Sequence, residues 1–150
     1  MAIGEICSRE VVLTTKDMSV RAAAQLMREY HVGALVVVDA TSGVRVPVGI
    51  LTDRDIAVGI VAKGLDADSL TVGEVMTPDL TTARERDGVA ETIERMRAKG
   101  VRRLPVVDDG GALVGIVTVD DFVDLLAEEM GALARMIARE QRREAEMRKV

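Results

Sequence analysis

The stretch "GILTDRD" at residues 49–55 recurs 66 positions later as "GIVTVDD" at residues 115–121. Both copies contain a glycine, two aliphatic residues, a threonine and, three residues after the threonine, an aspartate. A segment that is used twice in one chain indicates a duplicated structural unit.

The sequence around this stretch is duplicated as well. A shift of 69 residues aligns "IGEIC" from Ile3 with "VGEVM" from Val72, and "SVRAAAQLM" from Ser19 with "GVAETIERM" from Gly88. The same shift aligns "HVGALVVVD" with "GVRRLPVVD", after which the first copy has a loop that is three residues longer. Because surface loops tolerate insertions, we interpret the chain as a tandem repeat.

Each copy has the periodicities of a β-α-β-β-α unit. Thr71 and Glu74 form the spacing of a capping box, and Ser19 is a suitable N-cap for the next helix. The apolar runs "ALVVVD" and "LPVVD" do not alternate, which predicts strands that are buried on both faces. The predicted apolar helix faces are Val20, Ala23, Ala24 and Met27 in the first copy and Val89, Ile93 and Met96 in the second.

Neither copy is large enough to form a stable core alone. We therefore expect an α+β fold in which the two repeats pack through their sheets and share a core, followed by a C-terminal helix. The expected boundaries are 1–68 for the first repeat, 69–126 for the second and 127–150 for the helical extension.

The composition excludes several classes of protein. The chain has 150 residues, of which 48% are hydrophobic and 30% charged, as in a globular protein. Its net charge of −5 and aromatic content of 1% argue against binding to nucleic acid. No apolar run reaches the roughly 20 residues that a membrane span needs. We expect a cytoplasmic protein with no membrane contact.

The repeated threonine and aspartate have two interpretations. Each pair lies where a buried strand ends and a helix begins, and unpaired N–H groups at a helix start favour an anion such as phosphate. The threonine hydroxyl could join them on the phosphate, and the carboxylate could accept both hydroxyls of a ribose. The alternative is that both residues are helix caps.

The complete pattern resembles a tandem pair of CBS domains, the cystathionine β-synthase type repeat also called a Bateman module. The resemblance covers residues 2–126 and depends on "VGEVMTPD", "SVRAAAQLM", "VGILTDRDI" and "GVRRLPVVDDGGALVGIVTVDDF". It implies clefts between the repeats for AMP, ADP, ATP or another adenosine compound. It also implies that two copies of the module form a homodimer.

The resemblance assigns candidate nucleotide-binding residues in both copies. The phosphate-side hydroxyl falls on Thr52 and Thr118, and the ribose carboxylate on Asp55 and Asp121. The segments that contact the adenine edge and flank the base correspond to Leu13, Thr14, Ala34, Leu35 and Val36 in the first copy and to Thr82, Ala83, Arg103, Leu104 and Pro105 in the second.

The two copies differ in charge near these positions. Arg102 and Arg103 stand where the first copy has Gly33 and Ala34, and the nearest cations of the first copy are His31 and Arg54. Because guanidinium groups suit phosphate oxygens, we expect unequal affinities or a larger anionic ligand at one site. The alternative is that the two arginines form a solvated surface pair and that His31 is a loop residue.

The sequence supports neither catalysis nor a metal site. One histidine cannot be combined into a confident catalytic triad, and no second cluster of ligands completes a coordination shell around the aspartates. Cys7 aligns with Met76, so we interpret it as a small buried residue. We expect no enzyme and no catalytic cofactor, with an adenine nucleotide as regulatory ligand.

The C-terminal segment has the pattern of a long helix. Its apolar residues are spaced by threes and fours, and Gly131 is a candidate break. We expect this helix to form dimer contacts, to dock on a regulated protein or to fold back on its own module.

Two functions from different classes fit these observations, and a third fits poorly. The first is a stand-alone sensor of adenosine ligands that acts on an unidentified regulated protein. The second is a scaffolding or oligomerisation module with vestigial clefts. The third is an enzyme that acts on a nucleotide.

Overall fold

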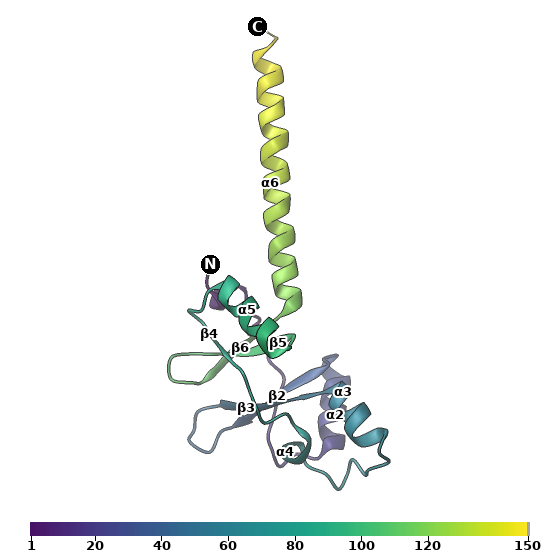
Figure 1. Ribbon diagram of the computed structural model, residues 1–150. Coiled ribbons are helices and arrows are strands. Elements are labelled where there is room, and N and C mark those ends of the chain that lie inside the picture. The colour runs from purple at the N-terminus through teal and green to yellow at the C-terminus, as the bar shows by residue number, and fades with distance from the viewer. Residues whose placement is uncertain (150) are drawn as a thin grey trace. The chain divides into compact units, whose positions relative to one another are not determined.

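The computed structural model describes residues 1–149, which divide into a unit of residues 1–117 and a unit that begins at residue 118. The first repeat contains a short α1 (Ile3–Ile6) and β1 (Leu13–Thr14), α2 (Val20–Tyr30), β2 (Ala34–Asp39) and β3 (Val46–Thr52). It ends with α3 (Asp53–Ile56), which continues as the π-helical turn η1 (Ala57–Val61). This order confirms the predicted β-α-β-β-α unit (Figure 1).

The second repeat has the same order of elements. It contains α4 (Val72–Val75), β4 (Ala83–Arg84), α5 (Val89–Lys99), β5 (Arg103–Val107) and β6 (Leu113–Thr118), followed by α6 (Val119–Met147). Each repeat forms one three-stranded sheet, in the order β1-β2-β3 or β4-β5-β6. In both sheets the short first strand runs parallel to the strand after the helix, which confirms the α+β class.

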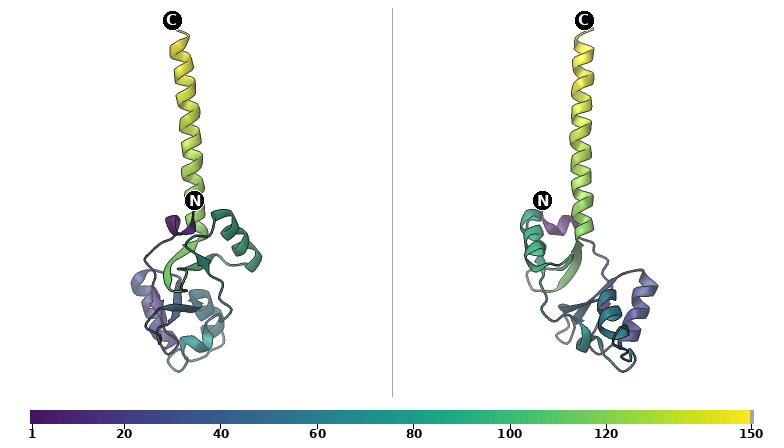
Figure 2. Two further views of the ribbon diagram at one scale, coloured as in Figure 1. Left: turned by 90° about the vertical axis from the view of Figure 1, so that its left-hand side faces the viewer. Right: turned by 45° about the vertical axis from the view of Figure 1, so that its right-hand side comes forward.

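Strand β2 is the centre of the first sheet. Its residues Leu35, Val36, Val37 and Val38 are all buried, as the absence of alternation predicted. Leu35 lies opposite Leu51 of β3, and helix α2 lies beside this sheet (Figure 2). Thr52 is the last residue of β3, which is an edge strand of this sheet and is held in place by its pairing with β2.

The core of the first repeat includes residues of the second. Val72 of α4 is fully buried in one cluster with Ala23, Met27, Leu35 and Leu51, and Val75 and Met76 pack against the same cluster. The short helix α4 is therefore part of the core of the first repeat, although in sequence it belongs to the second. Burial of the aliphatic side chains from both repeats is what makes the duplicated unit stable as a pair.

The segments that precede β1 and β4, which contain α1 and α4, are exchanged between the repeats. The backbone N–H of Ile3 donates to the carbonyl of Asp87 at 2.9 Å, and Ser8 pairs with Ile116 of β6. Conversely, the N–H of Val72 donates to the carbonyl of Met18 at 2.8 Å. A division of the chain at residue 68 therefore separates each short helix from the repeat that it contacts.

The predicted helix caps are present. The Ser19 hydroxyl accepts a hydrogen bond from the N–H of Ala22 at 3.1 Å, and the N–H of Thr71 donates to the Glu74 carboxylate at 2.8 Å. The apolar face predicted for α5 is wrong at one position. Ile93 is 37% exposed, whereas Thr92 is fully buried, and its hydroxyl is satisfied by donating to the carbonyl of Gly88.

The second unit is the single helix α6. It is continuous from Val119 to Met147 and includes Gly131, so the expected break at this glycine is wrong (Figure 1). A glycine inside a helix costs only about 1 kcal/mol relative to alanine, which the other turns of a helix of this length can offset. Within residues 1–149, no helix is both long and apolar enough to cross a membrane.

Candidate nucleotide-binding site

The repeated threonine and aspartate form reciprocal helix caps. In the first repeat the N–H of Thr52 donates to Oδ2 of Asp55 at 2.9 Å, and the N–H of Asp55 donates to Oγ1 of Thr52 at 3.1 Å. Such a capping box satisfies two backbone donors at the start of the helix. The capping interpretation is therefore correct for this pair, and only one of the Asp55 carboxylate oxygens is used.

The second pair forms a similar cap within the unit that contains α6, with a different use of the threonine hydroxyl. The N–H of Thr118 donates to Oδ2 of Asp121 at 2.7 Å, and its hydroxyl lies 3.2 Å from the same oxygen. Both residues are half-buried. The motif thus fixes the first turn of the following helix in each copy.

A cleft of about 450 Å³ lies beside the first pair, within residues 1–117. This volume is in the range of small-molecule sites. The cleft combines three separate segments: the end of β3 with the start of α3, the segment before β4, and the loop that leads into β5. Its lining residues are Ile50, Thr52, Asp53, Arg54, Thr77, Asp79, Leu80, Thr81, Gly100, Val101, Arg102, Arg103 and Leu104.

Five of the predicted site residues meet in this cleft. They come from both repeats and are Thr52, Arg54, Arg102, Arg103 and Leu104. Ile50, Leu80, Val101 and Leu104 supply apolar walls, so the cleft offers both a surface for a flat apolar group and cations for an anion.

Three arginines of the cleft are available to a ligand. Arg54 and Arg102 are exposed and Arg103 is half-buried. Within residues 1–149, no carboxylate lies within ion-pair distance of any of the three. Planar guanidinium groups bind phosphate and carboxylate oxygens in pairs, so these side chains suit an anionic ligand better than a neutral one.

The two copies differ at the position of Arg102. Its counterpart Gly33 lies against the carboxylate of Asp53, where an added Cβ would come within 3.1 Å of Oδ2. The N–H of Asp53 also donates to the carbonyl of Gly33 at 2.9 Å. The first copy therefore has a carboxylate packed at a glycine where the second has an arginine.

The other predicted site residues do not line this cleft. Asp55 is half-buried under its cap, and most of the rest lie on strands β1, β2, β4 and β5 or directly before one of them. These residues are Leu13, Thr14, Ala34, Leu35, Val36, Thr82, Ala83 and Pro105. Thr118 and Asp121 belong to the other unit.

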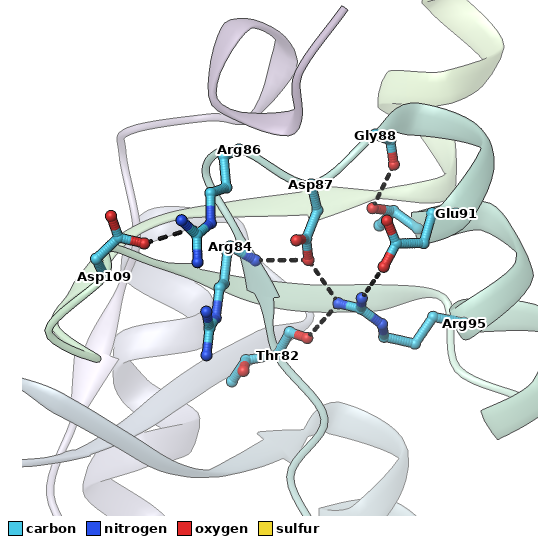
Figure 3. Close-up of polar contacts among 9 residues, drawn as sticks. Thr82, Arg84, Arg86, Asp87, Gly88, Glu91, Arg95 and Asp109 are labelled. Carbon is cyan, nitrogen blue, oxygen red and sulfur yellow. Dashed lines mark hydrogen bonds and ion pairs between the residues drawn. The ribbon is translucent and has the colours of Figure 1, made fainter.

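Thr82 is held by a charged cluster around Arg95 (Figure 3). The Arg95 guanidinium donates to the Thr82 carbonyl at 3.0 Å, to Asp87 Oδ2 at 2.7 Å and to Glu91 Oε1 at 2.7 Å. The backbone N–H of Arg84 donates to the same Asp87 oxygen at 2.9 Å. The carbonyl of Thr82 thus already has a donor, which fixes the backbone directly before β4.

The same cluster shifts two pKa values. Burial acts to raise the pKa of Asp87, but the hydrogen bonds from the Arg84 backbone and the Arg95 side chain outweigh it, so the pKa lies below its usual value. The hydrogen bond to Asp87 raises the pKa of Arg95. In the first repeat, Met18 and Leu26 occupy the aligned positions and pack against the apolar core instead.

Sequence reasoning missed several residues of the cleft. Asp53 stands inside the repeated motif, but the pattern assigns the ribose contact to Asp55 instead. Asp79, Leu80 and Thr81 follow the "MTP" turn and carry no such pattern. The exchange of α4 into the first repeat brings this turn to β3, since Thr77 pairs with Ile50. No local pattern encodes that approach.

The remaining candidates have structural positions. His31 is exposed and ends α2 in the left-handed conformation with φ of 54°. Cys7 is half-buried, and its thiol lies near Gly115. Among the described residues, no group of three His, Cys, Asp or Glu side chains is placed to hold a metal ion.

The chain belongs to the CBS-domain family. The family model matches twice, at residues 3–62 and 72–128, which confirms the tandem repeat. Hypoxic response protein 1 of Mycobacterium tuberculosis is 34% identical over 124 residues, which cover 83% of this chain and 84% of that protein. Protein MK0525 of Methanopyrus kandleri is 34% identical over 125 residues. That match covers 83% of this chain, which spans only 62% of the length of MK0525.

A solved structure supports the same assignment. The CBS domain pair of protein MJ0100, in complex with 5-methylthioadenosine and S-adenosyl-L-methionine, superposes with a TM-score of 0.74 at 29% identity. The match covers 86% of this chain and 98% of that chain. The mixed α and β architecture with two three-stranded sheets is therefore that of a CBS pair.

Proposed function

We propose that this chain is a regulatory module that binds a phosphate-bearing adenosine compound in the cleft next to Thr52. The observation that carries the proposal is that Arg54, Arg102 and Arg103 line one cleft of about 450 Å³ without a carboxylate partner. The domain pair of MJ0100 binds two adenosine compounds, which supports adenosine as the common part of the ligand. The arginines favour a nucleotide such as AMP, ADP or ATP over S-adenosyl-L-methionine, because a phosphate can satisfy several guanidinium donors at once.

Each part of the ligand has a proposed binding group. Ile50, Leu80 and Val101 hold the adenine between aliphatic side chains. The Thr52 hydroxyl and the arginines bind phosphate, and a carboxylate at the start of α3 accepts the ribose hydroxyls. Asp55, assigned this role by the family pattern, keeps one oxygen free of its cap, while Asp53, two residues earlier, lies directly in the lining.

The proposed role is regulation without catalysis. The cleft contains residues of both repeats, so a bound ligand would favour the arrangement of the repeats that best closes around it. We propose that a homodimer of the module transmits this preference to a regulated protein. Thr118 and Asp121 are proposed as a second ribose and phosphate site, which leaves one or two ligands per chain as a measurable outcome.

The test is isothermal titration calorimetry of the nucleotide-stripped protein with AMP, ADP, ATP, 5-methylthioadenosine and S-adenosyl-L-methionine. We expect Arg102→Gln or Arg103→Gln to weaken nucleotide binding about tenfold or more, because a charge-assisted hydrogen bond contributes about 1.5–3 kcal/mol. The exposed Arg97→Gln, whose side chain pairs with Glu94 on α5, is the matched control. Equal affinities of all three variants would contradict the proposed site.

The ribose contact needs a variant that keeps the helix cap. An Asp55→Ala change would remove the acceptor for the Thr52 N–H and could weaken binding by unfolding the first turn. Asp55→Asn keeps an oxygen acceptor and removes the charge. Weaker binding of adenosine compounds by folded Asp55→Asn or Asp53→Asn identifies the carboxylate. Unchanged binding by both excludes a ribose contact at this helix.

A further inference from the structure

One face of α6 carries exposed apolar side chains along its length. Val123, Leu126, Met130, Leu133 and Ile137 are each more than half exposed. Their spacing alternates between three and four residues, which is the a and d pattern of a coiled coil. A helix with such a stripe is stabilised when a second helix covers it.

The charges of α6 are divided between its halves. Residues 119–134 contain five acidic residues and no lysine or arginine, namely Asp120, Asp121, Asp124, Glu128 and Glu129. Residues 135–149 contain six basic residues against three glutamates, and the basic ones are Arg135, Arg139, Arg142, Arg143, Arg148 and Lys149. The helix dipole favours this polarity only within the first and last turns, so it does not explain a division that extends over the whole helix.

This division of charge selects an antiparallel partner of the same kind. In a parallel pair each acidic half would face another acidic half, and Glu140 and Glu144, which continue the heptad pattern, would face their own copies. In an antiparallel pair the acidic half of each helix faces the basic half of the other. Opposite charges along a helix pair determine its orientation.

We infer that α6 forms an antiparallel two-helix coiled coil with α6 of a second copy of this chain. The register that sets Leu126 opposite Ile137 and Met130 opposite Leu133, with a two-fold axis near Gly131, keeps four apolar layers. It is selected by charge, because it brings Asp120, Asp124 and Glu128 to the heights of Arg143, Arg139 and Arg135 of the other helix. Each contact then occurs twice, as in an isologous interface. Ala127 and Ala134 border the stripe on one side, and their small side chains permit a close approach of the helices. This inference does not depend on the proposed ligand.

Disulfide cross-linking tests the orientation in the full-length chain. Cys7 is replaced by alanine, and two proteins that carry Leu126→Cys or Ile137→Cys and differ in tag size are mixed and mildly oxidised. In the antiparallel register, residues 126 and 137 are opposite each other, whereas two copies of residue 126 are about 16 Å apart along the axis. A disulfide spans a Cα separation of only about 4.4–6.8 Å, so we expect the mixed disulfide to exceed either homodisulfide about tenfold.

A matched pair controls for random collision. Glu128→Cys and Arg135→Cys lie at the same height in the proposed register but on the far face of the helix, so their mixture should not cross-link above background. Homodisulfides at both residues 126 and 137 would show a parallel pair and overturn the inference. Absence of any disulfide above that background would indicate a helix that folds back or binds another protein, and would also overturn it.

Discussion

Gly115 of β6 lies directly against the backbone of Ser8. A Cβ atom added to Gly115 would lie 2.7 Å from the Ser8 carbonyl oxygen and 2.8 Å from Cys7 Sγ. Its counterpart Gly49 would place a Cβ 2.6 Å from Met76 Sδ and 3.0 Å from the carbonyl oxygen of Thr77. The repeated glycine is thus required where each repeat receives the exchanged segment.

Gly115→Ala should destabilise the fold. The new methyl group can be accommodated only if the Ser8 backbone moves, so we expect the free energy of unfolding to fall by about 1–3 kcal/mol. Urea denaturation followed by circular dichroism measures this change. Gly59→Ala is the control because an added Cβ there meets nothing within 4 Å. A Gly115→Ala variant as stable as the parent chain would contradict the close contact.

Asp87→Asn should weaken the charged cluster around Arg95 that holds Thr82. The variant retains an oxygen for the Arg84 N–H but loses the charged partner of Arg95, and we expect a loss of about 1–3 kcal/mol at pH 7. The pKa of Asp87 is lower in the folded chain, so its carboxylate stabilises the fold above the unfolded pKa of about 3.9. This contribution disappears as the pH falls through the lower, folded pKa.

The pH dependence separates this effect from general damage. Denaturation curves at a series of pH values should show the largest difference between parent and Asp87→Asn near neutral pH, and a shrinking difference below about pH 4. Glu94→Gln, in the exposed pair with Arg97, should change stability by less than about 1 kcal/mol. A difference for Asp87→Asn that stays constant down to pH 2 would indicate that charge is not its cause.

Local features of this fold could be predicted from the sequence. The caps at Ser19 and Thr71 and the buried strand β2 depend on residues a few positions apart, so their patterns are complete within a short window. The burial of Thr92 in place of Ile93 could not be predicted in this way. It depends on which side of α5 meets its sheet and on a hydroxyl that finds an acceptor within the helix.

The cleft was predictable only in part. Thr52 was found because it stands at a repeated position of the motif, and Arg103 because the family resemblance assigns it to the segment that flanks the base. Leu80 and Val101 were not found, because their contribution depends on the exchange of α4 between repeats, and the paired residues Ile50 and Thr77 belong to different copies. Pairing between segments distant in sequence is determined by packing, which a local pattern does not encode.

Gly131→Ala should stabilise α6. Gly131 is in the helix interior, and the nearest atom to an added Cβ is the flexible end of the Arg135 side chain at 3.2 Å. Alanine lowers the conformational entropy of the unfolded segment, so we expect a gain of about 0.5–1 kcal/mol. Amide hydrogen exchange across residues 119–147 should slow down in the variant. Unchanged exchange would indicate that α6 opens at another point than Gly131.

The charge division of α6 predicts how self-association responds to salt. If acidic and basic halves face each other, raising NaCl from about 0.05 M to 0.5 M shortens the Debye length and weakens their attraction, so the dissociation constant measured by sedimentation should rise. A parallel pair would respond in the opposite direction, because salt would screen repulsion between like halves. The variant Leu133→Glu places a charge in the apolar stripe and should abolish association through α6. It therefore separates this association from a dimerisation of the repeats themselves. In that variant we expect one association step to be lost and the remaining step to show no such increase with salt.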